Sequence, residues 1–379
     1  MKIVYIINQL RRSGPVNVLY NIILNLDREK FTPIVIKLMH DDVNRSYTYK
    51  FKELGIEIIE LDLSFWTLEL RTRFVAKKID KLLSQHDIKI INTHGYHPLL
   101  ISSYMRTKSI KIDTMHCISI DSFRSSRGEI IGRYMHLRYI HRLKKIDCRV
   151  GISNTVTNYY DNIITCSKGV TIYNGVDTNI YNCEPVLKER LKVKLGLNEY
   201  KTIFVVVGHL NELKDPCTII RAFRRLIDSR QLDDSCLIFC GNGPLYEKCI
   251  QLSHDYPMIK LVGFVNNVDE YLKVADFSIC ASHSEGFGLN YIEAVMCGCV
   301  VISSEIAAFS EFSSFYPKLG ALQFAVSDYI KLADTINELM LNPIDINEIM
   351  QDACCRFSAR GMSANYMSLY KQLSKEIDS

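Results

Sequence analysis

The chain has 379 residues, more than one ordinary hydrophobic core accommodates, so we expect two domains of about 180 residues each. Hydrophobic residues make up 47% of the chain and charged residues 23%, which excludes disordered and fibrous proteins. No apolar run approaches the roughly 18 residues of a membrane span, and polar residues from Asn8 onward interrupt the N-terminus too early for a signal peptide. These features predict a cytoplasmic protein.

The net charge of +4 conceals an asymmetry between the two halves. Residues 1–178 hold 27 Lys and Arg against 17 Asp and Glu, a net charge of +10, whereas the remainder holds 19 against 25, a net charge of −6. The first half is therefore expected to meet an anionic surface or substrate. The 13 cysteines show no repeated pair at metal-ligand spacing, so we interpret them as reduced and mostly buried.

Strand-like apolar runs alternate with helical patterns through the first half. Pro15 begins the first segment with apolar residues at helical spacing. This alternation predicts a parallel sheet with helices on both faces. The strand-like runs cover Lys2–Ile7, Pro33–Leu38, Ile56–Leu61, Ile88–Asn92, Ile110–Met115, Cys148–Ile152 and Val170–Ile172.

The same pattern restarts after a polar stretch that ends near Pro185, and Ser363–Glu376 closes the chain with helical spacing. Two doubly wound α/β domains follow, with ligands expected at the carboxyl ends of the strands. We expect the polar segment Asp121–Arg127 to be a loop. The strand-like runs of the second half are Thr202–Val207, Cys236–Cys240, Met258–Val262, Phe277–Cys280 and Val300–Ser303.

One glycine-containing segment of the second half holds most of the residues that suit ligand binding or catalysis. Gly286 and Gly288 let the backbone approach a ligand closely, and a helix that begins near Asn290 would offer free N–H groups to a phosphate. Glu285 in the loop and Glu293 in the first helical turn suit hydrogen bonds from sugar or ribose hydroxyls. A glycine turn beside a solvent-facing glutamate is the alternative interpretation.

Glu285 and Glu293, with seven residues between them, resemble the paired-glutamate signature of the family-4 retaining glycosyltransferases. That family has the GT-B fold, in which two Rossmann-like domains with doubly wound parallel sheets face each other across a cleft. The resemblance extends over nearly the whole chain, because further motifs follow in the family's order. They are Arg12–Pro15, Thr114–His116, Asn174–Asp177, Gly208–Lys214 and Gly241–Pro244.

The resemblance implies a role for each residue of the donor site. Glu293 would hold the donor ribose, Glu285 the transferred sugar, and Lys214 the diphosphate, whose negative charge grows as it leaves. Lys214 and Glu285, together with His116, would be the catalytic residues. The backbone that contacts the diphosphate and sugar would be that of Gly286, Phe287, Gly288 and Leu289.

The remaining expected site residues belong mostly to the first half. By resemblance, His116 would lie near the donor sugar, and Gly14 would admit the donor phosphate. His209 would also bind the donor, although the family commonly has arginine at this position. A neutral imidazole cannot replace the two parallel hydrogen bonds that arginine donates to a phosphate. His94 and His97 follow a strand, and we expect them to line the acceptor side rather than to bind a metal.

The chain contains no Asp-x-Asp, the motif that binds the metal ion in glycosyltransferases of the other major fold. We therefore expect neither a cofactor nor a metal. The segment 129–146 mixes apolar, aromatic and basic residues, and it is either a helix with a solvated basic face or a peripheral contact with an anionic membrane surface. Nucleic acid is not an expected partner, because no nucleic-acid-binding module accompanies this segment.

The resemblance assigns residues 1–178 to an acceptor-binding domain, onto which a C-terminal helix at 361–379 packs back, and residues 179–360 to a donor-binding domain. It implies transfer of a hexose or N-acetylhexosamine, with a UDP-sugar as the expected donor, to a saccharide acceptor. A lipid-linked acceptor in O-antigen or capsule synthesis, at the inner face of the cytoplasmic membrane, is the expected setting. A nucleotide-sugar 2-epimerase of the same fold and a non-catalytic nucleotide-sugar-binding protein remain as alternatives.

Overall fold

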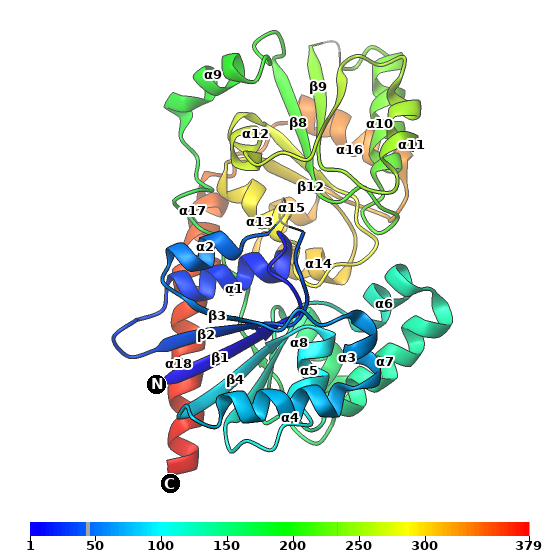
Figure 1. Cartoon of the computed structure of the whole chain (residues 1–379). Helices are drawn as coiled ribbons and strands as arrows, with labels where there is room; N and C mark the ends of the chain where they lie inside the picture. The colour runs from blue at the N-terminus through cyan, green and yellow to red at the C-terminus, as the bar shows by residue number, and fades with distance from the viewer. Residues whose placement is uncertain (43–45, 233, 379) are drawn as a thin grey trace. The chain divides into compact units, whose positions relative to one another are not determined.

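The computed structural model describes residues 1–42, 46–232 and 234–378. The chain divides into two compact units (Figure 1). The first unit is Met1–Gly175 together with Ala359–Ser379, and the second is Val176–Ser358. In each unit, helices pack on a sheet whose paired strands all run parallel. The prediction of two Rossmann-like α/β domains is therefore confirmed.

The sheet of the first unit has seven strands in the order β3-β2-β1-β4-β5-β6-β7. The order reverses between β1 and β4, which is the switch point at which such sheets bind ligands. The strands are β1 (Lys2–Ile7), β2 (Thr32–Lys37), β3 (Glu57–Glu60), β4 (Ile88–His94), β5 (Ile110–Met115), β6 (Cys148–Gly151) and β7 (Val170–Thr171).

Helices cover both faces of this sheet, which explains why β1 is a continuous apolar run with residues 3–7 all buried. Val4 and Ile6 pack with Val75 and Ile79 in one core cluster. The helices of the first unit are α1 (Gly14–Leu24), α2 (Thr48–Glu53), α3 (Phe65–Leu70), α4 (Thr72–Leu83), α5 (Tyr96–Ser102), α6 (Ser119–Arg127), α7 (Glu129–Leu143), α8 (Asn154–Ile163) and α18 (Ala359–Asp378).

The C-terminal helix α18 packs against α1 and β4 of the first unit, although more than 180 residues separate it from them in sequence (Figure 1). Two fully buried tyrosines hold it there. The Asn92 side chain donates to Tyr370 Oη at 2.9 Å, and Tyr370 Oη donates to Tyr5 Oη at 3.2 Å. Tyr366 Oη lies 3.2 Å from Thr114 Oγ1. The helix therefore completes the core of the first unit.

The second unit holds a six-stranded sheet in the order β10-β9-β8-β11-β12-β13. Its strands are β8 (Thr202–Val207), β9 (Ser235–Cys240), β10 (Ile259–Gly263), β11 (Phe277–Cys280), β12 (Val300–Ser304) and β13 (Gln323–Phe324). Its helices are α9 (Pro185–Lys194), α10 (Pro216–Asp228), α11 (Tyr246–Ser253), α12 (Val268–Val274), α13 (Leu289–Met296), α14 (Ala307–Phe315), α15 (Pro317–Gly320), α16 (Tyr329–Leu341) and α17 (Asn347–Arg356).

Two elements differ from the sequence-based expectation. The pattern did not indicate β13, because a two-residue strand is too short to show a period. The loop expected over Asp121–Arg127 is wrong, since these residues lie in helix α6. The segment has few apolar residues, but its Phe123 packs edge-on against Tyr96 and Tyr139, with ring centroids 5.3 and 6.1 Å away. Packing of the Phe123 ring helps to stabilise the helix although the segment has few apolar residues.

Truncation of Tyr370 to Ala should lower the free energy of unfolding by about 3–5 kcal/mol, because it empties a fully buried aromatic site. Tyr370→Phe should cost less, about 1–3 kcal/mol, since it keeps the ring and removes only the hydrogen bonds to Asn92 and Tyr5. Urea denaturation measures both values. Equal losses in the two variants would show that packing of the ring does not hold α18.

Candidate functional site

In the second unit, the loop after β8 is shaped by a close approach between two glycines. A Cβ atom on Gly241 would lie 1.8 Å from the carbonyl oxygen of Gly208, so only glycine fits. The Leu210 N–H donates to the Asn242 carbonyl at 3.0 Å. The two motif segments Gly208–Lys214 and Gly241–Pro244 therefore support each other. His209 is exposed in this loop.

Asp215 ends this loop and starts helix α10. Its backbone is left-handed, with φ 41°, and its side chain accepts from the Thr218 N–H at 3.2 Å as the helix cap. The same carboxylate lies 3.2 Å from His283 Nε2 and accepts from Ser327 Oγ at 2.8 Å. Although burial opposes ionisation, these hydrogen bonds lower the pKa of Asp215. The carboxylate therefore ties the β8 loop to the segment that carries the paired glutamates.

Lys214 and Glu285 form an ion pair between Nζ and Oε1. Their side chains are only 27% and 15% exposed, and Ser282 Oγ donates to the same Glu285 oxygen at 2.9 Å. Burial disfavours the charge on Lys214, but the nearby carboxylates of Glu285 and Glu293 raise the pKa of Lys214 above its ordinary value. The lysine therefore stays protonated in this shielded place.

Helix α13 positions Glu293 close to this pair. The helix begins at Leu289, so Glu293 is its fifth residue and lies in the second turn, not in the first turn as expected. Gly288 precedes the helix with φ 90°, a left-handed conformation that favours glycine. The Asn290 side chain donates to the Val207 carbonyl at 3.0 Å, which joins the start of α13 to the end of β8.

The remaining expected donor residues fill the turn before α13. Phe287 is 2% exposed, and its ring packs between Phe312 and Phe357 at centroid distances of 5.1 and 5.7 Å. Its side chain thus belongs to the core, and only its backbone is available to a ligand. Gly286 lies beside it, and Leu289 is the first residue of the helix.

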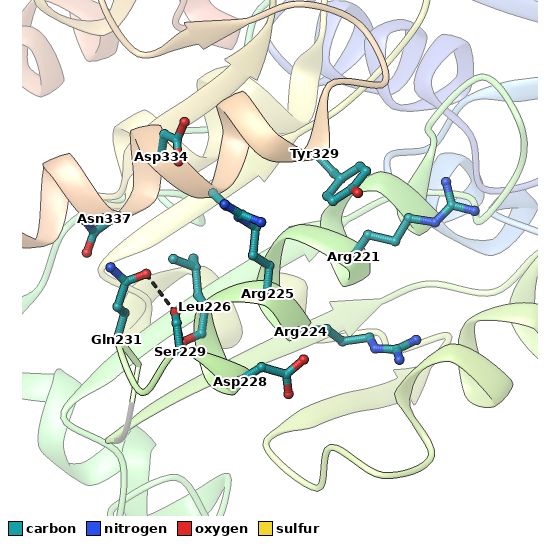
Figure 2. Close-up of a pocket in the computed structure, with 11 residues that line it drawn as sticks. Arg221, Arg224, Arg225, Leu226, Asp228, Ser229, Gln231, Tyr329, Asp334 and Asn337 are labelled. Carbon is teal, nitrogen blue, oxygen red and sulfur yellow. Dashed lines mark hydrogen bonds between the residues drawn. The ribbon is translucent and has the colours of Figure 1, made fainter.

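A narrow hollow of about 10 Å³ lies at the carboxyl ends of β8 and β11, lined by His209, Lys214 and Asn290 among others. A wider hollow of about 940 Å³ lies elsewhere in this unit, between α10 and α16 (Figure 2). Arg221, Arg224 and Arg225 line it, but none of the expected site residues does. We place the candidate donor site at the strand ends, because there the charges and the free end of α13 converge.

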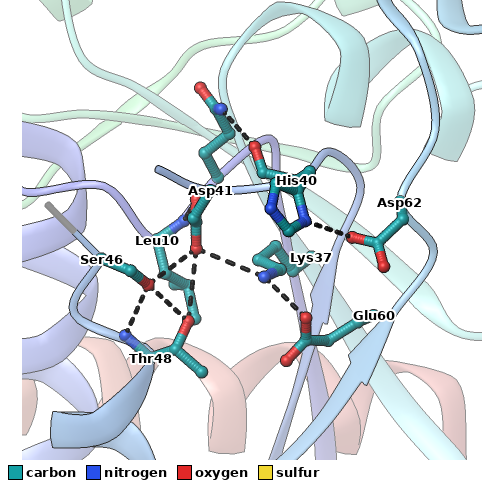
Figure 3. A network of polar contacts seen from close by, with 9 residues as sticks. Leu10, Lys37, His40, Asp41, Ser46, Thr48, Glu60 and Asp62 are labelled. Carbon is teal, nitrogen blue, oxygen red and sulfur yellow. Dashed lines mark hydrogen bonds and ion pairs between the residues drawn. The ribbon is translucent and has the colours of Figure 1, made fainter. Parts of the chain in front are cut away.

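In the first unit, a buried carboxylate fixes the loop that follows β1 (Figure 3). Asp41 accepts from the Leu10 N–H at 3.0 Å, and its other oxygen lies 3.3 Å from Lys37 Nζ and 2.9 Å from Ser46 Oγ. Lys37 also contacts Glu60 at 2.7 Å. The loop is therefore held at the carboxyl edge of the sheet, where Gly14 begins helix α1.

A pocket of about 520 Å³ opens at the same edge. Its volume is in the range of small-molecule sites. The structure brings three expected histidines to it, from the end of β4, from α5 and from the end of β5. They are His94, His97 and His116. Aromatic rings surround them, from Phe65, Tyr96, Phe123, Tyr139 and Tyr160.

His94 and His116 contact each other directly, with Nδ1 of His94 2.8 Å from Nε2 of His116. Burial lowers the pKa of His116 to about 4, and burial together with His116 lowers the pKa of His94 well below its ordinary value. Both rings are therefore neutral near pH 7. A neutral pair suits hydrogen bonding to a sugar better than binding to a phosphate.

Two polar contacts support the walls of this pocket. His97 Nε2 lies 3.1 Å from a Glu69 oxygen, and Arg138 of α7 forms an ion pair with the same carboxylate. Burial opposes the charge of Glu69, but His97 and Arg138 lower its pKa. Asp113 is fully buried and accepts from Tyr139 Oη at 2.7 Å, and burial raises the pKa of Asp113 to about 7.

Sequence reasoning missed the residues that position the expected site. Asp215 had a signal, since it precedes Pro216 at a helix start. Ser282 also had a signal, since it lies only three residues before Glu285. Asp41 and Asn290 had none, because their partners lie 31 and 83 residues away in the chain. Among the described residues, no group of three potential metal ligands gathers.

Comparison with known proteins shows similarity in both halves of the chain. The sequence model of the family described as Glycosyltransferase Family 4 matches residues 12–180, and that described as Glycosyl transferases group 1 matches residues 188–354. The O-antigen biosynthesis glycosyltransferase WclY of Escherichia coli is 23% identical over all of both chains.

Two further similarities concern a relative and a solved structure. An Escherichia coli UDP-Gal:alpha-D-GlcNAc-diphosphoundecaprenol alpha-1,3-galactosyltransferase is 22% identical over 67% of this chain and 68% of its own. The crystal structure of Anabaena Alr3699/HepE in complex with UDP and glucose superposes with a TM-score of 0.78, at 15% identity over 98% of this chain and 100% of that one.

The two family models together span nearly the whole chain, so the protein is a glycosyltransferase. Within that class it belongs to the family-4 type with the GT-B fold.

The neutral state of His116 is directly observable. Because its pKa is lowered to about 4 from an ordinary value of 6.5, the folded ring should stay neutral from pH 8 to pH 5, whereas the unfolded chain becomes protonated there. This difference lowers the free energy of unfolding as the pH falls from 6.5 towards 4. Nitrogen-15 NMR of labelled protein, with His116→Gln to assign the signal, measures the titration. A midpoint near 6.5 would contradict the geometry.

Proposed function

We propose that the protein transfers a hexose or N-acetylhexosamine from a UDP-sugar to a lipid-linked saccharide, with retention of anomeric configuration, in the synthesis of a surface polysaccharide. The observation that carries the proposal is the cluster of Lys214, Glu285 and Glu293 at the strand ends of the second unit. The names of the relatives support an O-antigen setting and a UDP-linked donor. Binding of UDP and glucose by the structural neighbour supports the same donor class.

In this proposal, the ion pair of the ligand-free protein is exchanged when the donor binds. Lys214 turns from Glu285 to the diphosphate, and Glu285 accepts from hydroxyls of the transferred sugar. Each charge thereby keeps a partner, which avoids the cost of an unpaired buried ion. Glu293 holds the ribose, and His209 and the backbone of the Gly286–Leu289 turn complete the donor site.

The chemical step needs stabilisation of the leaving diphosphate. The positive charge of Lys214 and the N-terminus of the eight-residue helix α13 supply it without a metal. As the family resemblance implies, the acceptor hydroxyl attacks the anomeric carbon from the side on which the diphosphate departs, and its proton passes to the departing diphosphate oxygen. That geometry retains the anomeric configuration.

The acceptor sugar occupies the pocket of the first unit. The side chains of His94, His97 and His116 offer hydrogen-bonding groups, and the aromatic rings offer flat apolar surfaces to a sugar. By the family resemblance we also assign His116 to recognition of the transferred sugar and Gly14 to recognition of the donor phosphate.

The first unit also carries an unusual exposed surface, which we call the apolar–basic surface. Seven large apolar side chains of α3, α4 and α7 are exposed on it, and Arg138 joins α7 to α3 and α4 through Glu69 and Thr72. Ile130 is 84% and Leu70 78% exposed. The seven residues are Trp66, Leu70, Phe74, Ile130, Ile131, Tyr134 and Leu137.

Exposed basic residues accompany these apolar side chains. Exposed lysines and arginines occur on both helical segments, namely Arg71, Arg73, Lys77, Lys78, Arg133, Lys144 and Lys145. Of the helices in the described parts, none combines the length and apolarity that crossing a bilayer requires. Apolar side chains within a basic rim suit the interface of an anionic bilayer, where each nearby cation contributes about 1 kcal/mol. We propose that this surface docks on the inner face of the cytoplasmic membrane.

The donor site can be tested by substitution. Lys214→Gln or Glu293→Gln should lower kcat about 10²–10³-fold, because each removes a polar partner of the donor in the transition state. The assay follows release of the nucleoside diphosphate in the presence of a lipid-linked acceptor. Lys188→Gln is the matched control, since Lys188 pairs with Asp276 at 2.7 Å in the same unit outside the site. Near-normal turnover in the first two variants would contradict their roles.

Membrane docking can be tested by co-sedimentation with vesicles that contain phosphatidylglycerol. The triple variant Ile130→Ser, Ile131→Ser and Leu137→Ser should bind at least about tenfold more weakly, since a tenfold change needs only about 1.4 kcal/mol. The control variant is Val186→Ser with Val193→Ser, whose side chains are equally exposed on α9 of the second unit. Equal binding by both variants would contradict the assignment of this surface.

A further inference from the structure

The charged side chains that line the pocket of the first unit are both arginines. Among the side chains that line it, Arg11 and Arg127 carry formal charges, and no aspartate or glutamate is present. Arg11 belongs to the loop after β1 that Asp41 fixes through Leu10, and Arg127 is the last residue of α6. A pocket of this composition favours an anionic ligand.

The guanidinium of Arg127 is held in place by an aromatic ring. Its carbon lies 4.7 Å from the centroid of Phe65, a stacking contact that leaves the N–H groups at its edge available. Phe65 in turn packs edge-on against His97, with centroids 5.4 Å apart. The arginine is thus oriented by the same wall that carries the expected acceptor histidine.

The carboxylates nearest to this wall are already engaged. Glu69 is bound by His97 and Arg138, and Glu129, two residues beyond Arg127, pairs with Arg124. Among the ion pairs of the described residues, none involves Arg11 or Arg127. Arg11 and Arg127 therefore line the pocket without a carboxylate partner. The neighbouring Arg124 and Arg138, by contrast, are paired with glutamates.

We propose that Arg127, together with Arg11, binds the diphosphate of a sugar-diphosphate-lipid acceptor. The inference rests on the function proposed above and deepens it, because it assigns the anionic part of the acceptor to named residues. A planar guanidinium matches two phosphate oxygens at once, and the aromatic wall then receives the sugar. The exposed apolar side chains of α7 begin at Ile130, three residues after Arg127, so a lipid tail has an apolar path from this point.

The donor also carries a diphosphate, so the two sources must be separated by experiment. We compare two soluble acceptors that bear the same sugar, one linked through a diphosphate to a short prenyl chain and the other an uncharged alkyl glycoside. Arg127→Gln and Arg127→Lys are the test variants. Arg28→Gln is the matched control, because Arg28 is an exposed arginine of the same unit that does not line the pocket.

Arg127→Gln should raise the KM for the diphosphate acceptor about 10–100-fold, the usual effect of losing a charge-assisted hydrogen bond. The KM for the alkyl glycoside and for the UDP-sugar should not change, and Arg127→Lys should restore part of the loss. Titration calorimetry with the prenyl diphosphate sugar should show the same loss of affinity without any turnover. Arg28→Gln should behave as the wild type.

Three results would overturn the inference. An equal rise in KM for both acceptors would mean that Arg127 only supports the pocket wall. A rise in the KM for the UDP-sugar would assign the arginine to the donor. Unchanged calorimetric affinity in Arg127→Gln would remove the subsite, even if turnover fails. If the wild type binds the prenyl diphosphate sugar but transfers nothing to either acceptor, the proposed function is wrong and the subsite stands.

Discussion

Every paired strand in each unit runs parallel to its neighbours, and the candidate sites depend on this constraint. Parallel strands end at one edge, so loops far apart in the sequence must meet there. Val207 and Asn290 come into contact in this way although they are 83 residues apart, and so do His94 and His116. The polar groups at that edge need partners, and the observed ion pairs and hydrogen bonds supply them until a ligand does.

The charged side chains of the two candidate sites are partnered differently in the two units. In the second unit, the positive charge of Lys214 is met by the carboxylates of Glu285 and Glu293. In the first unit, burial keeps His94 and His116 neutral, and Arg11 and Arg127 remain without carboxylate partners. This difference fits a donor whose negative charge is met by one lysine in the second unit. It also fits a negatively charged acceptor that binds the arginines of the first unit. The sequence shows the same difference, because residues 1–178 carry a net charge of +10 and the remainder carries −6.

The sequence predicted the fold well because buried parallel strands are apolar on both faces. The expected bounds of β5, β8 and β11 agree with the structure. Motif glycines also carry a physical signal, as the close approach of Gly241 to Gly208 shows. By contrast, α6 forms because Phe123 finds two aromatic partners, and the exposure of Trp66, Leu70 and Phe74 depends on which faces the fold covers. Neither is visible in local patterns, and the expected roles of the site residues remain predictions.

The most direct test of the account is a transfer reaction with EDTA present throughout. The purified protein is incubated with a panel of UDP-, GDP-, dTDP- and ADP-sugars and a sugar-diphosphate-lipid acceptor, and the product is analysed by mass spectrometry and proton NMR. The account predicts that a UDP-sugar adds one residue to the acceptor and that the anomeric configuration of the donor is retained. Consumption of the nucleotide sugar without an elongated acceptor, or a product of inverted configuration, would contradict it.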